Sequence, residues 1–220
     1  MALIDNLIKE GWLKTPRISE AFRKIKRVDF LPEDSKDLAE LNEALPIGYG
    51  QTISQPLVVA FMLELLSPEP GEKILDIGSG SGWTSALLGE IVGPRGKIIA
   101  IDIVPELVEF GQNNVKKYNL IERGIVEFIY ADGSKGYEKE APFDKILASA
   151  SAEILPQSWK EQLKIGGRIV TPIGSSIWLF IKKKKEGDES SAHLHSAING
   201  FVFEEIEYPG FVFVPLITRR

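Results

Sequence analysis

The feature that most constrains the fold is a short apolar segment that runs directly into a glycine-dense turn, Lys73-Ile74-Leu75-Asp76-Ile77-Gly78-Ser79-Gly80-Ser81-Gly82-Trp83. The apolar part has the character of a buried strand, and the residues from Trp83 onward have the character of a helix. Because glycines carry no Cβ, backbone N–H groups at such a turn can approach a nucleotide-like ligand closely. The spacing is G-x-G-x-G, not the G-x-G-x-x-G of dinucleotide-binding proteins, and with Asp76 before the first glycine it favours S-adenosylmethionine over NAD.

Beyond Gly71, segments with strand character alternate with segments of helix character. The expected strands cover 73–77, 97–102, 125–130, 143–149 and 168–173, and the expected helices cover 83–92, 105–118 and 153–163. This alternation predicts an α/β protein with a doubly wound, mostly parallel, Rossmann-like sheet that carries helices on both faces. Nearer the C-terminus, the segments 178–183, 193–198 and 201–207 are strand-like, and Asn199-Gly200 is a tight-turn signal, so we expect an antiparallel hairpin at the end of the sheet.

The N-terminal part is expected to be helical. Apolar residues at helical spacing predict a first helix that ends at Gly11, a second that Ser19 could cap, and a third over 55–66. The inner face of the second is expected to carry Ala21, Phe22, Ile25 and Val28. We therefore divide the chain into an N-terminal helical portion that covers the substrate and cofactor (1–70) and an S-adenosylmethionine-binding methyltransferase domain (71–220), which together form one compact unit.

Three acidic residues sit at the ends of three successive expected strands. Asp76 could hold the amino group of a methionine moiety, directly or through water, and Asp102, which lies 24 positions after Gly78, could accept both hydroxyls of a ribose. Asp132 could accept from an adenine amino group. Any one of them alone would be interpreted as a loop residue or a helix cap. Because parallel strands present their carboxyl ends at one edge, the three acids together with the glycine turn predict S-adenosylmethionine binding.

Composition excludes several classes of function. The 31 acidic and 26 basic residues give a net charge of −5, which predicts no general attraction to nucleic acid or to an anionic membrane. The chain has no cysteine, so disulfides, thiolate metal sites and cysteine nucleophiles are excluded. His193 and His195 have no acidic cluster nearby, and no metal is expected. The run Lys182–Lys185, followed by acidic residues, is typical of a solvated loop.

The sequence also carries signals about location and assembly. The N-terminus lacks the features of a signal peptide, and no apolar run approaches the ~18 residues of a membrane span. We therefore expect a soluble cytoplasmic protein, with a monomer favoured.

Two features that are missing from the sequence narrow the class of methyl acceptor. After the fourth strand, Asp144-Lys145-Ile146-Leu147-Ala148-Ser149-Ala150 contains no Asn/Asp-Pro-Pro-Tyr-like segment, which many amino-directed methyltransferases use. Without cysteine, thiolate addition to a base is impossible. Oxygen acceptors, small molecules and some ring nitrogens remain.

One segment narrows these alternatives further. The segment Leu45–Pro56 contains Gly-Gln-Thr-Ile-Ser-Gln-Pro. This segment and the glycine turn together resemble the protein-L-isoaspartate (D-aspartate) O-methyltransferase family. The similarity continues in order through Ile101–Leu107, Asp132-Gly133, Leu163–Val170 and Phe213–Leu216, and so covers nearly the whole chain.

The resemblance implies a methyltransferase fold and methyl transfer from S-adenosylmethionine to the free carboxylate of isoaspartyl, and D-aspartyl, residues in damaged proteins. It places the active-site residue at Ser54 and substrate contacts at Thr52, Ile53, Ser54 and Val214. The implied cofactor-binding residues are Gln51, Thr52, Asp76, Gly78, Ser79, Gly80, Asp102, Ile103, Asp132 and Gly133.

The expected chemistry suits a site without a strong base. A carboxylate with a pKa near ~3.5–4 is already ionised at neutral pH and needs no general base. Ser54 can orient it by a hydrogen bond. As an alternative, a serine just before Gln55-Pro56 is also a good helix N-cap, and the two roles are compatible.

Two other functions stay open at the level of sequence. The chain departs from the family pattern at Leu57 and Val58, where many relatives carry an aromatic residue or His and then Met. A carboxyl methyltransferase acting on one specific peptide aspartate or on a small acid is one alternative. A non-catalytic adaptor that binds cofactor or peptide is the other.

Overall fold

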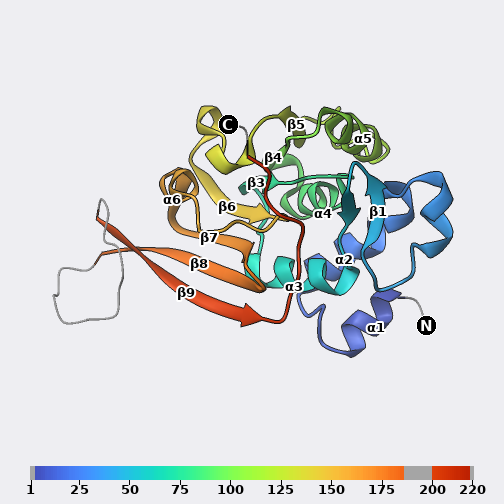
Figure 1. Ribbon diagram of the computed structural model, residues 1–220, viewed down its shortest axis with the longest axis horizontal. Helices are drawn as coiled ribbons and strands as arrows, with labels where there is room; N and C mark the ends of the chain where they lie inside the picture. The colour runs from blue at the N-terminus through green and yellow to red at the C-terminus, as the bar shows by residue number, and fades with distance from the viewer. Residues whose placement is uncertain (1–2, 186–199, 219–220) are drawn as a thin grey trace.

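The computed structural model describes residues 3–185 and 200–218. Within them, a twisted sheet has the strand order β5-β4-β3-β6-β7-β8-β9 (Figure 1). The strands are β3 (Lys73–Ile77), β4 (Lys97–Asp102), β5 (Val126–Tyr130), β6 (Phe143–Ala148), β7 (Leu163–Ile173), β8 (Ser176–Lys184) and β9 (Phe201–Pro209). The strands from β5 to β7 pair in parallel, whereas β8 and β9 are antiparallel to their neighbours. The Rossmann-like sheet with an antiparallel end is thus confirmed.

Helices lie on both faces of the sheet. They are α1 (Leu3–Lys9), α2 (Pro16–Lys24), α3 (Pro56–Leu66), α4 (Trp83–Val92), α5 (Pro105–Lys116) and α6 (Gln157–Gln162), with short 3-10 turns η1 (Arg27–Phe30), η2 (Glu33–Leu38), η3 (Gly93–Arg95), η4 (Gly133–Lys135) and η5 (Glu138–Glu140). Successive strand residues point to opposite faces and enter two cores. Ile74 joins the core with α2, α3, α4 and α5, and Leu75 joins the core with Trp159 of α6.

The topology places a crevice at the end of β3. Because β3 lies between β4 and β6, the chain leaves it toward one edge of the sheet and later returns on its other side. In open α/β sheets, ligands bind outside the carboxyl ends of the strands at such a switch point.

Two segments outside the alternating pattern lie near this crevice. A small hairpin, β1 (Leu45–Gly48) with β2 (Gln51–Ile53), brings the side chain of Ile47 close to Gly80. After β9, the chain turns back and runs across the molecule toward β6 (Figure 1). We call residues 212–217 the C-terminal strap.

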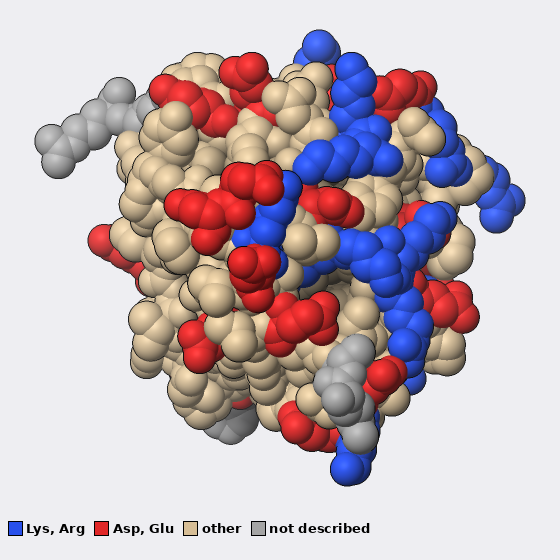
Figure 2. Space-filling model, turned by 90° about the vertical axis from the view of Figure 1, so that its right-hand side faces the viewer, with Lys and Arg blue, Asp and Glu red and all other residues tan. Residues whose placement is uncertain are grey.

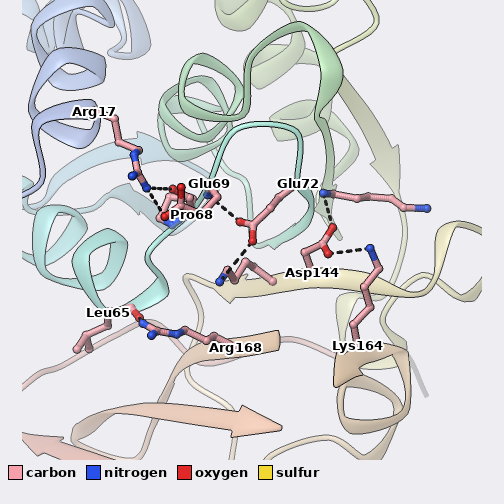
Figure 3. A network of polar contacts seen from close by, with 10 residues as sticks. Arg17, Leu65, Pro68, Glu69, Glu72, Asp144, Lys164 and Arg168 are labelled. Atoms are coloured by element: carbon pink, nitrogen blue, oxygen red, sulfur yellow. Dashed lines mark hydrogen bonds and ion pairs between the residues drawn. The ribbon is translucent and has the colours of Figure 1, made fainter. Parts of the chain in front are cut away.

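The opposite edge of the sheet is joined to the N-terminal helices by polar contacts (Figure 3). Asp144 accepts a hydrogen bond from the backbone N–H of Lys73 at 2.8 Å and pairs with Lys164 at 2.7 Å. Arg168 Nη1 donates to the carbonyl of Leu65 at the C-terminal end of α3, at 2.8 Å. The Asp144 contacts join the beginnings of β3, β6 and β7, and the bond from Arg168 fixes α3 at the end remote from the crevice.

Some sequence-based expectations were wrong in detail. The helix α2 begins at Pro16 after the N-cap Thr15, so Ser19 lies inside it, and Val28 falls in η1 with 36% of its surface exposed. Lys182, expected in a solvated loop, is a buried residue of β8, because its ammonium donates to the carbonyls of Lys160 and Leu163.

Element boundaries also shift. The expected helix 153–163 shortens to α6, and the expected strand 168–173 lengthens to β7, which begins where α6 ends. The segment 193–198, His193, His195 and Asn199 lie outside the described residues.

Gly111 on α5 lets that helix lie directly against the glycine turn. A Cβ at this position would lie 2.8 Å from the backbone oxygen of Gly80 and 2.7 Å from Phe128 Cε1. Contacts this short require movement of the turn's backbone or of the strand below it, so the absence of a side chain at Gly111 determines how closely helix and turn pack.

We expect Gly111→Ala to lower the free energy of unfolding by roughly 1–2 kcal/mol, because overpacking against backbone atoms outweighs the higher helix propensity of alanine. Urea unfolding monitored by circular dichroism measures the change. The matched control is Gln112→Ala at the next, exposed position of α5, which should stay within about 0.5 kcal/mol of wild type. Unchanged stability in Gly111→Ala would show that α5 can move away from the turn.

Candidate active site

A pocket of about 340 Å³ lies beyond the carboxyl ends of β3 and β4. Its walls come from the segment that joins β2 to α3, the glycine turn, the end of β4, the loop after β6 and the C-terminal strap. The predicted site residues that line it are Gln51, Thr52, Ile53, Ser54, Gly78, Ser79, Gly80, Asp102, Ile103, Gly133 and Val214. Residues far apart in sequence thus meet around one space.

The glycine turn is tied to the end of β4. The backbone N–H groups of Gly78 and Ser79 both donate to the carbonyl of Ile101, at 2.9 and 3.0 Å. Gly78 and Gly80 have φ values of 74° and 49°, a left-handed region that glycine adopts without steric penalty. The turn therefore presents backbone to the pocket where side chains would otherwise stand.

Asp102 connects the turn to the start of α5. Its Oδ2 accepts from the N–H of Gly80 at 2.8 Å, and its Oδ1 accepts from the N–H of Val104 at 3.0 Å. Burial raises the pKa of this carboxyl group, and the backbone hydrogen bonds oppose that rise. A carboxylate can accept about four hydrogen bonds, so Asp102 retains capacity for the two hydroxyls of a diol at the pocket wall.

Asp76 lies beneath the pocket and does not line it. The side chain is fully buried, and its Oδ2 accepts from Ser85 Oγ at 2.6 Å. Burial raises the pKa of Asp76 to about 7, with a smaller contribution in the same direction from Asp102. This acid can therefore change its protonation state near neutral pH.

Asp132 also lies outside the pocket lining. Its Oδ1 accepts from the backbone N–H of Ser134 at 3.0 Å and from Ser134 Oγ at 2.7 Å, so it caps the short turn η4. The next residue, Gly133, is the one that lines the pocket. The predicted contact of Asp132 with an adenine amino group stays a prediction.

Ser54 stands between β2 and α3 on the pocket wall. Gln55 is the N-cap residue of α3, but its side chain makes no capping hydrogen bond. Asn42 supplies an acceptor instead, because its Oδ1 accepts from the N–H of Leu57 at 3.0 Å. The alternative in which Ser54 is the helix N-cap is therefore wrong, and Ser54 is a residue of the pocket wall.

The C-terminal strap closes one side of the pocket. The N–H of Ser151 donates to the carbonyl of Val214, and the N–H of Leu216 donates to the carbonyl of Ser151, both at 2.8 Å. Val212 lines the pocket and is 93% exposed. The strap thus offers apolar side chains at the pocket mouth.

Three buried polar atoms near the pocket have no hydrogen-bond partner in the described part of the chain: Asp76 Oδ1, Ser79 Oγ and Trp83 Nε1. Buried polar groups in proteins are normally paired. Ser79 and Trp83 line the pocket, so a polar ligand there can supply partners. Together with the diol-binding capacity of Asp102, these atoms fit the charged and hydroxylated groups of S-adenosylmethionine.

The sequence did not reveal every residue of the pocket. Thr84, Leu107, Ser149 and Ala150 also line it. Ser149 and Ala150 follow the carboxyl end of β6, so the rule that located the three acids could have found them. Leu107 is an apolar residue on the buried side of α5 and carried no signal for binding.

Among residues 3–185 and 200–218, no group of three or more His, Cys, Asp or Glu side chains is arranged to hold a metal ion. In the same described ranges, no helix has the length and apolar character needed to cross a membrane.

Comparison with known proteins gives consistent results. The model of the family Protein-L-isoaspartate(D-aspartate) O-methyltransferase (PCMT) matches residues 1–202. A protein-L-isoaspartate O-methyltransferase of Methanopyrus kandleri is 40% identical over 222 residues, covering 99% of this chain and 91% of that protein. Protein-L-isoaspartate O-methyltransferase 2 of Archaeoglobus fulgidus is 48% identical over 171 residues, covering 77% of each.

Solved structures share the fold. A β-aspartate methyltransferase from Plasmodium falciparum, crystallised with S-adenosyl-L-homocysteine, matches with a TM-score of 0.80 at 23% identity over 99% of this chain and 97% of that chain. A protein-L-isoaspartate O-methyltransferase matches with a TM-score of 0.75 at 28% identity over 82% of this chain and 59% of that chain. With the family model spanning 1–202, the chain belongs to the protein-L-isoaspartate(D-aspartate) O-methyltransferase family.

Proposed function

We propose that this S-adenosylmethionine-dependent enzyme methylates the free carboxylate of L-isoaspartyl and D-aspartyl residues in damaged proteins and so initiates their repair. The single observation that carries the proposal is the position of Ser54, whose segment shares one pocket with the glycine turn and Asp102. A residue that can orient a carboxylate therefore lines the same space as the residues suited to the cofactor.

The residues that would hold the cofactor follow from their donors and acceptors. Backbone groups of Gly78, Ser79 and Gly80 form the turn at the pocket wall, and Asp102 would accept hydrogen bonds from the hydroxyl groups of the ribose. Asp76 beneath the turn offers a negative charge for an ammonium group. When bound, S-adenosylmethionine supplies a methyl group that is activated by a positively charged sulfur.

The substrate carboxylate needs orientation and little else. It is ionised at neutral pH, so no base has to remove a proton from it. A hydroxyl donor such as Ser54 can orient one oxygen, whereas a tightly paired Lys or Arg would lower the nucleophilicity of the carboxylate. Thr52, Ile53 and Val214 would contact the surrounding peptide. Alignment in a site that excludes water can contribute about 7–11 kcal/mol to catalysis.

The two alternatives are less well supported. Val58, at one of the positions that depart from the family pattern, lines the pocket, whereas Leu57 does not. A single altered wall position can tune peptide preference without removing the cofactor groups. The full set of pocket residues argues against an adaptor, and the names of the relatives favour the repair reaction.

We further propose that the enzyme acts in the cytoplasm as a monomer, with residues 1–70 and 71–220 forming one compact unit, and that it takes isoaspartyl-containing proteins and peptides as partners but not nucleic acid. On the face drawn in Figure 2, Lys and Arg side chains gather along one side with Asp and Glu side chains beside and among them. The acidic side chains on this face and the net charge of −5 of the whole chain support the proposal that nucleic acid is not a partner.

The substrate is tested with two peptides that differ only in an isoaspartyl or a normal aspartyl linkage. We expect base-labile transfer of labelled methyl from S-adenosylmethionine to the isoaspartyl peptide alone. If neither peptide is methylated but adenosylhomocysteine raises the melting temperature of the protein, the specialised-substrate alternative is favoured. Absence of both transfer and a melting shift would favour the adaptor without a cofactor pocket.

We expect Ser54→Ala to lower kcat/KM for the isoaspartyl peptide by about 10- to 100-fold, the range for losing one hydrogen bond to a charged group. Affinity for adenosylhomocysteine should change little, because other residues hold the cofactor. The control is Ser19→Ala in α2, whose hydroxyl bonds to the carbonyl of Thr15 outside the pocket. Full activity in Ser54→Ala would exclude a role for this hydroxyl in orienting the carboxylate.

Asp76→Asn should make the cofactor-free protein more stable above pH 7. The folded-state pKa of Asp76 is about 7, raised from 3.8, so between these values the folded state binds more protons than the unfolded state and stability falls as pH rises. Asparagine stays neutral at every pH. The gain in the free energy of unfolding of Asp76→Asn over wild type therefore approaches about 4 kcal/mol above pH 7 and disappears near pH 4.

Urea unfolding at several pH values measures this difference, and calorimetry should show weaker binding of adenosylhomocysteine to Asp76→Asn. Parallel pH profiles for wild type and Asp76→Asn would contradict the raised pKa. Ser85→Ala is the companion variant, since it removes the hydrogen bond that favours the ionised form.

A further inference from the structure

Arg27, in the short turn η1, is a buried cation next to the candidate site. Only 6% of its surface is exposed. Its Nη1 donates to the carbonyls of Ala39 and Leu41 at 3.1 and 2.9 Å, and its Nη2 donates to those of Glu43 and Ser54 at 2.6 and 3.3 Å. The acceptors are thus four backbone carbonyls.

Burying a charge away from water costs free energy unless the surrounding structure compensates for the lost hydration. Burial lowers the pKa of Arg27 to about 10, so the guanidinium stays charged at neutral pH. It also stands over the ring of Trp83, with 5.6 Å between Cζ and the ring centroid, and Trp83 lines the pocket. Arg27 therefore contacts the cofactor side of the site through Trp83 and the substrate side through Ser54.

The carbonyls that Arg27 binds belong to two segments that meet around Ser54. Ala39, Leu41 and Glu43 lie in the loop before β1, and Asn42 in the same loop accepts from the N–H of Leu57 at the start of α3. The loop is thus fixed to α3 just after Ser54, and the guanidinium is fixed to Ser54 itself. One arginine links the loop, the serine and the indole.

We propose that Arg27 is a positioning residue for methyl transfer, which holds the backbone of Ser54 so that its hydroxyl meets the substrate carboxylate in a fixed place. This proposal rests on the proposed role of Ser54. A planar guanidinium fixes several carbonyls at once with little loss of side-chain freedom. Nη1 and Nη2 are engaged by carbonyls, the buried Nε has no hydrogen-bond partner in the described part of the chain, and Arg27 is not among the residues that line the pocket. Arg27 therefore orients the serine without pairing directly with the substrate.

Lysine cannot reproduce this arrangement. Its ammonium is a point charge on a flexible stem, whereas the bonds of Arg27 spread over two nitrogens and four carbonyls. Arg27→Lys therefore retains the charge but leaves part of the carbonyl set unsatisfied. We expect kcat for the isoaspartyl peptide to fall about tenfold. The dissociation constant of adenosylhomocysteine should stay within about threefold, because the turn and Asp102 are untouched.

A double-mutant cycle with Ser54→Ala separates positioning from general stability. If Arg27 acts through the Ser54 hydroxyl, adding Arg27→Lys to Ser54→Ala causes little further loss of kcat. If Arg27 only stabilises the fold, the two losses multiply, and the proposal is overturned. Full activity in Ser54→Ala itself would instead remove the proposed role of the serine, so that failure is distinguishable from failure of the Arg27 proposal.

The matched control is Arg168→Lys, which alters a guanidinium bond to the carbonyl of Leu65 at the other end of α3 (Figure 3). Arg168→Lys should leave kcat unchanged. In a double-mutant cycle with Ser54→Ala, its effect on kcat should be independent of the serine substitution. A tenfold loss of kcat in this control would show that any anchor of α3 suffices, and would overturn a specific role for Arg27. If Arg27→Lys does not fold, Asn42→Ala replaces it, and the same non-additivity with Ser54→Ala decides the question.

Discussion

The hydrogen bonds between the glycine turn and the end of β4 are the constraint on which the candidate site depends. Gly78 and Ser79 donate to one carbonyl of β4, and Gly80 donates to the carboxylate of Asp102. These bonds require left-handed backbone in the turn and a helix without a side chain at Gly111. The turn's position then determines where α4 begins and which polar atoms face the pocket.

Much of the fold was predictable because local patterns and tertiary structure agree. The strands 73–77 and 97–102 and the helix 83–92 were located to the residue, since each is an uninterrupted apolar or periodic run beside a glycine turn. The start of α2 was not, because Ser19 resembles a cap while Pro16 begins the helix. Likewise, the burial of Lys182 depends on carbonyls of a different element, which no local pattern shows.

The residues of the candidate site also divide into those that were predictable from the sequence and those that were not. The spacing of the glycines located the turn, and the family resemblance supplied Thr52, Ile53, Ser54 and Val214, so most predicted residues line the pocket. Asp76 and Asp132 were predicted from their strand-end positions but support the pocket from behind, because a strand-end position does not determine where a side chain points. Arg27 gave no signal at all: among 26 basic residues, its burial arises only when loops distant in sequence close over it.

The C-terminal strap has a consequence for the order in which the enzyme is made. Its residues form a pocket wall by pairing with Ser151, although the cofactor-side groups lie more than 70 positions earlier in the chain. A ribosome releases the glycine turn, Asp102 and Ser54 long before it releases residues 212–217. A nascent chain that has not yet reached residue 217 therefore carries an incomplete pocket, and competence for peptide methylation has to wait for the strap.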